Sequence, residues 1–173
     1  VSNGALSMVQ LLLLAVLPAA ATLHARRDPE RLRRLYERGN RYVLAGAVLL
    51  FAPLASAAER LLVVWLGPGQ ADAAIVLRGL SLACGVLVMA GMATSVARGL
   101  GRTDLEARFA VVVLVVHLAL AALLMPSLGL VGAMIAMVAS TFAGVASFLW
   151  RFAGALGWPR WRTLVEPHRV PLM

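Results

Sequence analysis

Arginine is the residue type in this sequence with the clearest capacity for binding chemistry. Seven arginines fall within the sixteen residues from Arg26 to Arg41, between two stretches that are almost wholly apolar. A guanidinium group binds phosphates and carboxylates through a planar set of donors. A basic run of this kind is typical of proteins that bind nucleic acid, an acidic partner or a membrane surface.

The composition favours the membrane surface. The chain is 61% hydrophobic, with a mean hydropathy of +0.87, whereas a soluble domain needs apolar residues mainly in its core. All sixteen basic residues are arginine, and fourteen of them lie within 26–41, 98–108 and 151–169, which are the gaps and tail between apolar windows. We therefore predict an integral membrane protein with juxtamembrane arginines and no nucleic-acid partner.

Apolar windows of about 18 residues or more are long enough to cross roughly 30 Å of hydrocarbon as helix. The sequence predicts an all-α, polytopic membrane helix bundle of about five transmembrane helices, at 5–23, 42–58, 72–97, 107–125 and 130–150. A secretory signal is disfavoured for the first window because its positive charges follow the apolar core. We expect Pro53 to kink the second helix, which ends in a break at about residue 58 and is followed by a short interfacial segment carrying Trp65.

The arginines also predict an orientation. Loops 26–41 and 98–108 hold ten arginines, whereas the loops "GPGQA" and "PSLG" on the other side hold none. The basic side is expected to be cytoplasmic, together with the tail 153–173, and residue 1 is then outside. From this outer N-terminus and the odd number of spans, we expect the C-terminal piece of a longer chain whose N-terminal half is its missing partner.

The arginine run itself has the pattern of a short amphipathic helix over about 29–38. Asp28 is a good N-cap before Pro29, and Gly39 is placed to end the helix. Leu32, Leu35 and Tyr36 share one face. We expect this helix to lie on the inner leaflet, where the anchoring arginines meet anionic headgroups: Arg26, Arg27, Arg31, Arg34 and Arg38. Substrate docking by the same arginines is the alternative.

Two ionisable residues lie inside apolar windows and are candidate substrate-binding residues. Arg78 is about six residues, or roughly 9 Å, into the third window. It either snorkels to the headgroups or faces a water-filled cavity, where it could bind a phosphate. His117 is near the centre of the fourth window. It either bonds a neighbouring carbonyl or hydroxyl, or titrates in ion coupling.

Small residues recur every four positions through the fifth window, at Gly132, Ala136, Ser140 and Gly144. Such a seam allows two helices to approach closely, and we interpret it as a packing surface.

No catalytic constellation is apparent, and we predict no enzyme activity, no cofactor and no metal site. Asp28, Glu30 and Glu37 are surrounded by arginines, while Asp104 and Glu106 are two residues apart and point to different helix faces. The single cysteine, Cys84, excludes an intramolecular disulfide and a cysteine-pair zinc site.

Four segments in order resemble the C-terminal half of polysaccharide flippases: "LPAAATLHARRDPERLRRLYERGNR", "FAPLASAAERLLVVWLG", "ARGLGRTDLEAR" and "LLMPSLGLVGAMIAM". These flippases belong to the multidrug/oligosaccharidyl-lipid/polysaccharide exporter superfamily. The resemblance covers roughly residues 5–152. It rests on a proline near the end of one span, a "WLG" after the next, a "GR" loop and a proline–glycine hairpin.

The resemblance implies a two-lobed transporter in a bacterial inner membrane, with this chain supplying later helices of the second lobe. Its ligand would be a lipid-linked oligosaccharide, moved from the inner to the outer leaflet. Family members often carry Asn where this sequence has His117, so no polar role transfers to that position. The alternatives are an integral membrane enzyme of lipid or polysaccharide synthesis and a drug exporter of the same superfamily.

Overall fold

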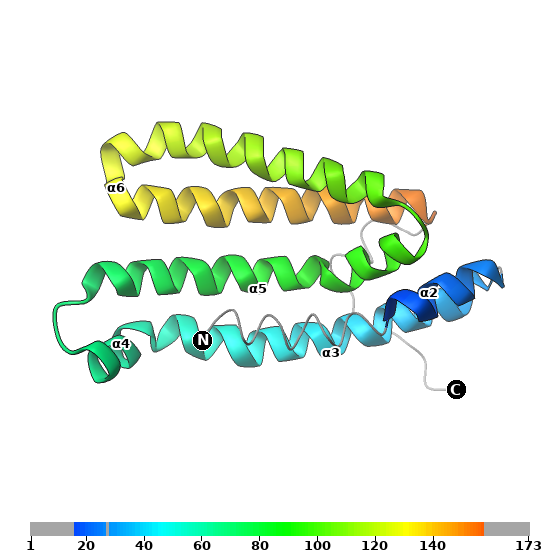
Figure 1. The fold of residues 1–173 in the computed structure, drawn as a ribbon, viewed down its shortest axis with the longest axis horizontal. Helices are drawn as coiled ribbons and strands as arrows, with labels where there is room; N and C mark the ends of the chain where they lie inside the picture. Colours follow the sequence, from blue (N-terminus) through cyan, green and yellow to red (C-terminus); the bar gives the residue numbers. More distant parts are fainter. Residues whose placement is uncertain (1–15, 27, 158–173) are drawn as a thin grey trace.

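The computed structural model describes residues 16–26 and 28–157, and all the regular structure in that part of the chain is α-helix. The prediction of an all-α protein is confirmed for these residues. The helices, labelled as in Figure 1, are α2 (Val16–Ala25), α3 (Pro29–Ser56), α4 (Ala58–Leu66), α5 (Ala71–Gly99) and α6 (Thr103–Ala155). The expected first span lies mostly outside the described residues, as does the tail beyond residue 157.

Helix α5 lies in the middle of the bundle (Figure 1). It packs along α3 on one side and along α6 on the other, and it also contacts α2 and α4. The larger core cluster lies where α2, α3, α5 and α6 meet, around Tyr36, Val96 and Phe148. A smaller cluster of Ala47, Phe51 and Val88 joins α3 to α5 further along.

The start of α3 follows the sequence pattern, but its expected end does not. Asp28 Oδ1 accepts a hydrogen bond from the backbone N–H of Arg31 at 3.0 Å, which confirms the predicted cap. The prediction that Gly39 ends the helix is wrong, because α3 continues through it to Ser56. A Cβ at position 39 would collide with the Met92 side chain of α5, so this glycine permits close helix packing. Residues 29–38 are therefore the first turns of a long helix.

The chain breaks between α3 and α4, which are bent by 63° relative to each other. The break falls at Ala57, whose backbone N–H donates to the carbonyl oxygen of Pro53 at 2.8 Å. Helix α3 continues through Pro53 to Ser56, and the predicted break near residue 58 is confirmed. Trp65 lies on α4 with 70% of its surface exposed, and its placement among lipid headgroups stays a prediction.

Helix α6 is a hairpin of two antiparallel arms, because the chain reverses at Gly129 (Figure 1). Gly129 has φ of 54° and ψ of −129°, a conformation that side chains rarely tolerate. We call residues 103–128 the first arm and residues 130–155 the second arm. This reversal confirms the hairpin predicted from "PSLG".

The small-residue seam is the surface on which the two arms pack. Ala136 and Ser140 are buried, and the second arm places Gly144 against Val113 and Phe148 against Phe109 of the first arm. A Cβ added at Gly144 would lie 3.0 Å from Phe109 Cε2 and closer still to Val113 Cγ2. The packing interpretation of the seam is confirmed.

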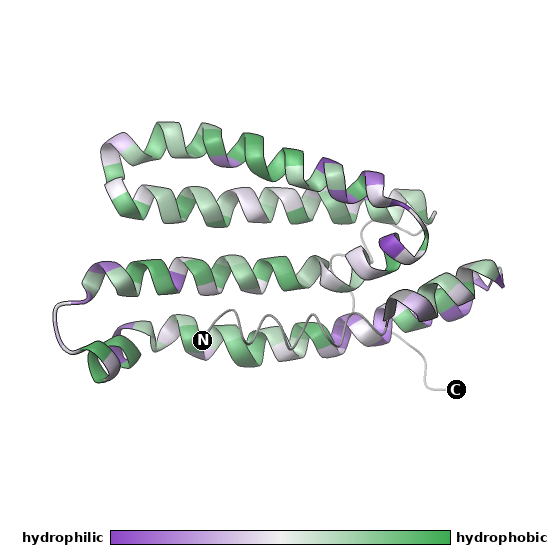
Figure 2. Cartoon of the chain, in the orientation of Figure 1, coloured by the Kyte–Doolittle hydropathy of each residue, from purple (hydrophilic) through white to green (hydrophobic). Residues whose placement is uncertain are grey.

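The hydropathy of the bundle is divided along its length (Figure 2). The helices are apolar over most of their length, and polar residues gather at the first turns of α3 and around the turn between α5 and α6. We call this the arginine-rich end. Helices α5 and α6 are long and apolar enough to cross a membrane, and the bent pair α3–α4 qualifies as a third candidate. Each arm of α6 would extend about 39 Å as a straight helix.

Candidate functional site

Arg78, the first predicted binding residue, forms an ion pair with the neighbouring helix α4. Its Nη2 donates to Glu59 Oε2 at 3.0 Å, and 45% of the Arg78 side chain is exposed. The 63° bend after α3 turns α4 toward α5, and the two helices are in contact. Ala58 and Leu62 of α4 are buried, and this packing places Glu59 next to Arg78. Sequence reasoning missed Glu59 because nineteen residues separate the partners.

The ion pair with Glu59 occupies only some of the hydrogen-bond donors of Arg78. A guanidinium has five N–H donors, and the contact with Glu59 occupies one nitrogen. The remaining donors of a half-exposed arginine can still bind an anion, with Glu59 holding the side chain in place. Ala74 and Ser81, four residues before and three residues after Arg78 on α5, are buried in the bundle.

His117, the second predicted binding residue, lies between the arms of α6. Its Nδ1 is 3.4 Å from Ser140 Oγ. The Ser140 hydroxyl donates its one proton to the carbonyl oxygen of Met137 at 3.0 Å, so its oxygen is left to accept from His117. This arrangement favours the tautomer with the proton on Nδ1. The structure therefore contains a hydroxyl partner for His117, as the interpretation of a hydrogen bond to a neighbouring carbonyl or hydroxyl requires.

Arg78 and His117 are not brought together. Arg78 is on α5 and contacts α4, whereas His117 is on the first arm and contacts the second. Among the described residues, no side chain connects the two by an ion pair or hydrogen bond. The pair therefore does not form one binding site within this part of the chain.

The predicted membrane-anchoring arginines divide into paired and unpaired groups. Arg31 pairs with Asp28 at 3.2 Å and Arg34 with Glu30 at 3.5 Å. Arg26 and Arg38 are exposed and have no acidic partner in the part of the chain that the structure describes. Arg27 lies outside the described residues. Whether these arginines bind headgroups stays a prediction.

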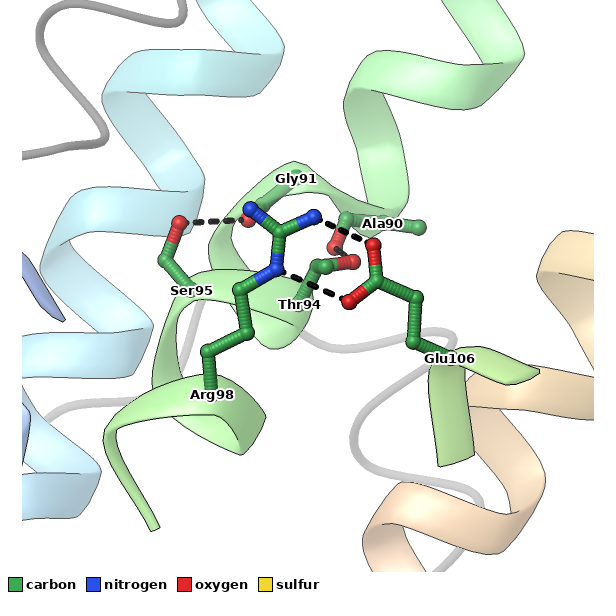
Figure 3. A network of polar contacts seen from close by, with 6 residues as sticks. All are labelled: Ala90, Gly91, Thr94, Ser95, Arg98 and Glu106. Atoms are coloured by element: carbon green, nitrogen blue, oxygen red, sulfur yellow. Dashed lines mark hydrogen bonds and ion pairs between the residues drawn. The ribbon is translucent and has the colours of Figure 1, made fainter. Parts of the chain in front are cut away.

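A fork-like ion pair closes the turn between α5 and α6 (Figure 3). Arg98 Nε donates to Glu106 Oε2 at 2.8 Å, and Arg98 Nη2 donates to the other carboxylate oxygen. These hydrogen bonds hold the pKa of Glu106 below its ordinary value, against a smaller opposing effect of burial. Asp104 pairs separately with Arg102 at 3.1 Å. Asp104 and Glu106 therefore act apart, as their spacing predicted.

The arginine-rich end also contains a cavity of about 450 Å³ that the sequence did not reveal. We call it the helix-end cavity, because ends of α2, α3, α5 and α6 form its wall. The wall is mostly apolar, and Asp28 and Arg102 are its charged members. The sequence contained only an indirect sign of this cavity, which is that apolar residues lie close to the arginine clusters in the terminal turns of these helices.

Within residues 16–26 and 28–157, no group of three or more His, Cys, Asp or Glu residues could hold a metal ion. Cys84 is a free thiol, half-buried beside the smaller core cluster. The chemistry that these residues offer is therefore anion binding by arginine and hydrogen bonding by His117.

Over residues 16–26 and 28–157, fold and site together define a helical bundle with two or three helices that are long and apolar enough to cross a membrane. The comparisons with known proteins add no identity to this class. The chain matches no protein-family model, no curated protein and no solved structure.

Proposed function

We propose that this chain is part of a membrane transport protein that moves lipid-linked oligosaccharide from the inner to the outer leaflet. The observation that carries the proposal is the position of the flippase-like segments in the fold. The "WLG" segment ends α4, "GR" forms the turn before α6, and the proline–glycine segment reverses α6. These segments lie at helix junctions, as the resemblance to the C-terminal half of polysaccharide flippases implies.

The transporter would reside in a bacterial inner membrane, with its arginine-rich end in the cytoplasm. Further helices of the same protein would complete a two-lobed bundle, in which the chain described here contributes to the second lobe. The first arm offers an apolar surface for lipid or such helices, because Val111, Leu114 and Leu118 are each more than half exposed. The product would serve cell-surface polysaccharide synthesis.

In this proposal Arg78 binds the diphosphate of the lipid-linked sugar. A guanidinium forms two parallel hydrogen bonds with a phosphate, and Glu59 would orient it for that contact. His117 would contribute a hydrogen bond deeper in the bundle, on the other side of the second arm.

The test uses the complete transporter in lipid vesicles that contain a fluorescent polyprenyl-diphosphate oligosaccharide. The measurement is the fraction of label that a membrane-impermeant quencher reaches over time. We expect the protein to speed exchange between the leaflets compared with protein-free vesicles. No acceleration would contradict the proposal, and transport of a fluorescent drug-like cation in its place would support the exporter alternative.

Variants of the ion pair test the role of Arg78 separately from its structural contact. Arg78→Ala should abolish exchange, and Arg78→Lys should restore only part of it because a point charge lacks the two parallel donors. Glu59→Gln should retain most activity, since it keeps the arginine. The double exchange Arg78→Glu with Glu59→Arg preserves an ion pair and should remain inactive. An active double exchange would show that the pair serves only to hold α4 on α5.

A further inference from the structure

The helix-end cavity is formed by residues of the packed bundle, and the proposed transport function assigns it no role. Its apolar wall includes the large side chains of Leu23, Leu32, Leu100, Leu105, Phe152 and Leu156, together with the smaller Ala155. Among these, Leu32, Leu105 and Phe152 are at most 5% exposed, so the wall belongs to the packed core. A volume of about 450 Å³, mostly apolar walls and a few charged groups are typical of a site for a small amphiphilic molecule.

The position of the cavity indicates what kind of molecule would fill it. The wall is made by the last turns of α2 and α5, the first turns of α3 and both ends of α6. These turns form the arginine-rich end, which would lie at the depth of the cytoplasmic headgroups in a membrane. Acyl chains reach this depth directly from the leaflet, so hydrocarbon can enter without crossing water.

The charge around the cavity indicates the headgroup. Arg102 and Asp28 in the wall already pair with Asp104 and Arg31. Three arginines close in sequence to wall residues form no ion pair in the described part of the chain and are exposed, although Arg108 is also attracted to Asp104. They are Arg26, between wall residues Leu23 and Asp28, Arg108, three residues after Leu105, and Arg151, directly before Phe152.

We propose that the helix-end cavity binds one acyl chain of an anionic membrane phospholipid, whose headgroup is held by Arg26, Arg108 and Arg151. Basic pockets between membrane helices on the cytoplasmic side bind anionic headgroups in this way. The apolar wall supplies affinity for the chain, and the unpaired arginines supply the preference for negative charge. The inference depends on the proposed membrane location and is independent of transport.

The first experiment measures lipid retained by the purified protein from an equal mixture of phosphatidylglycerol and phosphatidylcholine, using native mass spectrometry. We expect the wild-type protein to retain phosphatidylglycerol preferentially. Ala155→Phe, which places a ring in the cavity wall, should abolish this retention. Ala119→Phe, at an exposed alanine on the first arm away from the cavity, is the matched control and should behave as wild type. Equal retention by both variants would overturn the proposal.

The arginines are tested by Arg26→Gln and Arg151→Gln. Each should lower the preference for phosphatidylglycerol over phosphatidylcholine by about fivefold, as expected for one arginine near an anionic headgroup. Arg60→Gln, at an unpaired arginine on α4, should leave the preference unchanged. An effect of Arg60→Gln as large as that of Arg26→Gln would contradict a specific site, because general surface charge would then explain the preference.

A second measurement does not depend on Ala155→Phe folding correctly. A single cysteine at Ala155, in a Cys84→Ser background, should react more slowly with a maleimide in phosphatidylglycerol than in phosphatidylcholine micelles. A cysteine at Ala119 should react equally in both. Equal rates at Ala155 would refute the lipid site. Phosphatidylglycerol binding that appears only after removal of residues 158–173 would also refute it, because the chain's own segment would then be the occupant.

Discussion

At the scale of single residues, several arginines of the described chain pair with acidic side chains near the helix junctions. Arg78 pairs with Glu59, Arg98 with Glu106, and Arg102 with Asp104. The first two pairs join consecutive helices across a loop or turn, whereas Arg102–Asp104 is a local contact at the start of α6. Arginines without an acidic partner, and the donors of Arg78 that Glu59 leaves free, are then available to lipid or substrate.

The Arg98–Glu106 pair makes a prediction about pH. Because the folded pKa of Glu106 lies below its ordinary value of 4.5, the pair contributes stability above that value. The contribution is lost as the pH falls through the lowered folded pKa. Since both side chains are at least one third exposed, we expect a loss of about 1 kcal/mol or less.

The measurement compares unfolding of wild type and Glu106→Gln in mixed micelles, at neutral pH and well below the pKa of glutamate. The wild-type protein should be more stable than the variant at neutral pH, and this difference should vanish in acid. A difference that stays constant with pH would show that Glu106 contributes through packing and not through its charge.

At the scale of helices, glycine sets how closely neighbours approach. A Cβ at Gly39 would collide with Met92, and one at Gly79 would lie 2.8 Å from Met134 Sδ. These glycines bring α3 and the second arm against α5. In a bilayer, close contact between helices is a main source of association, because lipid tails are as apolar as the side chains.

Gly144→Ala should destabilise the hairpin of α6. The added methyl group would meet Val113, a β-branched side chain with little freedom to move, and the expected cost is about 1–3 kcal/mol. Gly46→Ala is the matched control, because nothing lies within 4 Å of its Cβ position. That change should be neutral or stabilise α3 by up to about 1 kcal/mol. Reversible unfolding in mixed micelles measures both, and equal effects would show that close contact at Gly144 does not limit the packing of the two arms.

Local signals in the sequence predicted the helix junctions well. Asp28 caps α3, the break follows Pro53, and α6 reverses at Gly129, because each feature depends on residues within one turn. Gly39 was misinterpreted because a glycine inside a helix and one at its end look alike until the neighbouring helix is known. The Arg78–Glu59 pair and the helix-end cavity depend on how helices meet in space, which no short stretch of sequence specifies.

At the scale of the whole molecule, the two ends of the bundle differ in charge. The arginine-rich end carries the clusters at the start of α3 and around the turn between α5 and α6 (Figure 2). At the other end, the described residues include two arginines, Arg60 and Arg78, and both lie within helices. An excess of arginine in short loops holds that side of a membrane protein in the cytoplasm, whereas acidic residues contribute little.

This asymmetry predicts the orientation of the bundle, which cysteine labelling in intact cells can measure. With Cys84 replaced by serine, single cysteines at Gln70 and Leu128 should react with a membrane-impermeant maleimide. Both positions are exposed, in the loop before α5 and next to the reversal of α6. A cysteine at Thr103, exposed in the turn before the first arm, should react only after the cells are permeabilised. That second step is the control, because it shows that the thiol at position 103 is reactive. Labelling of Thr103→Cys in intact cells, with protection of the other two positions, would reverse the predicted orientation and place the helix-end cavity in the outer leaflet.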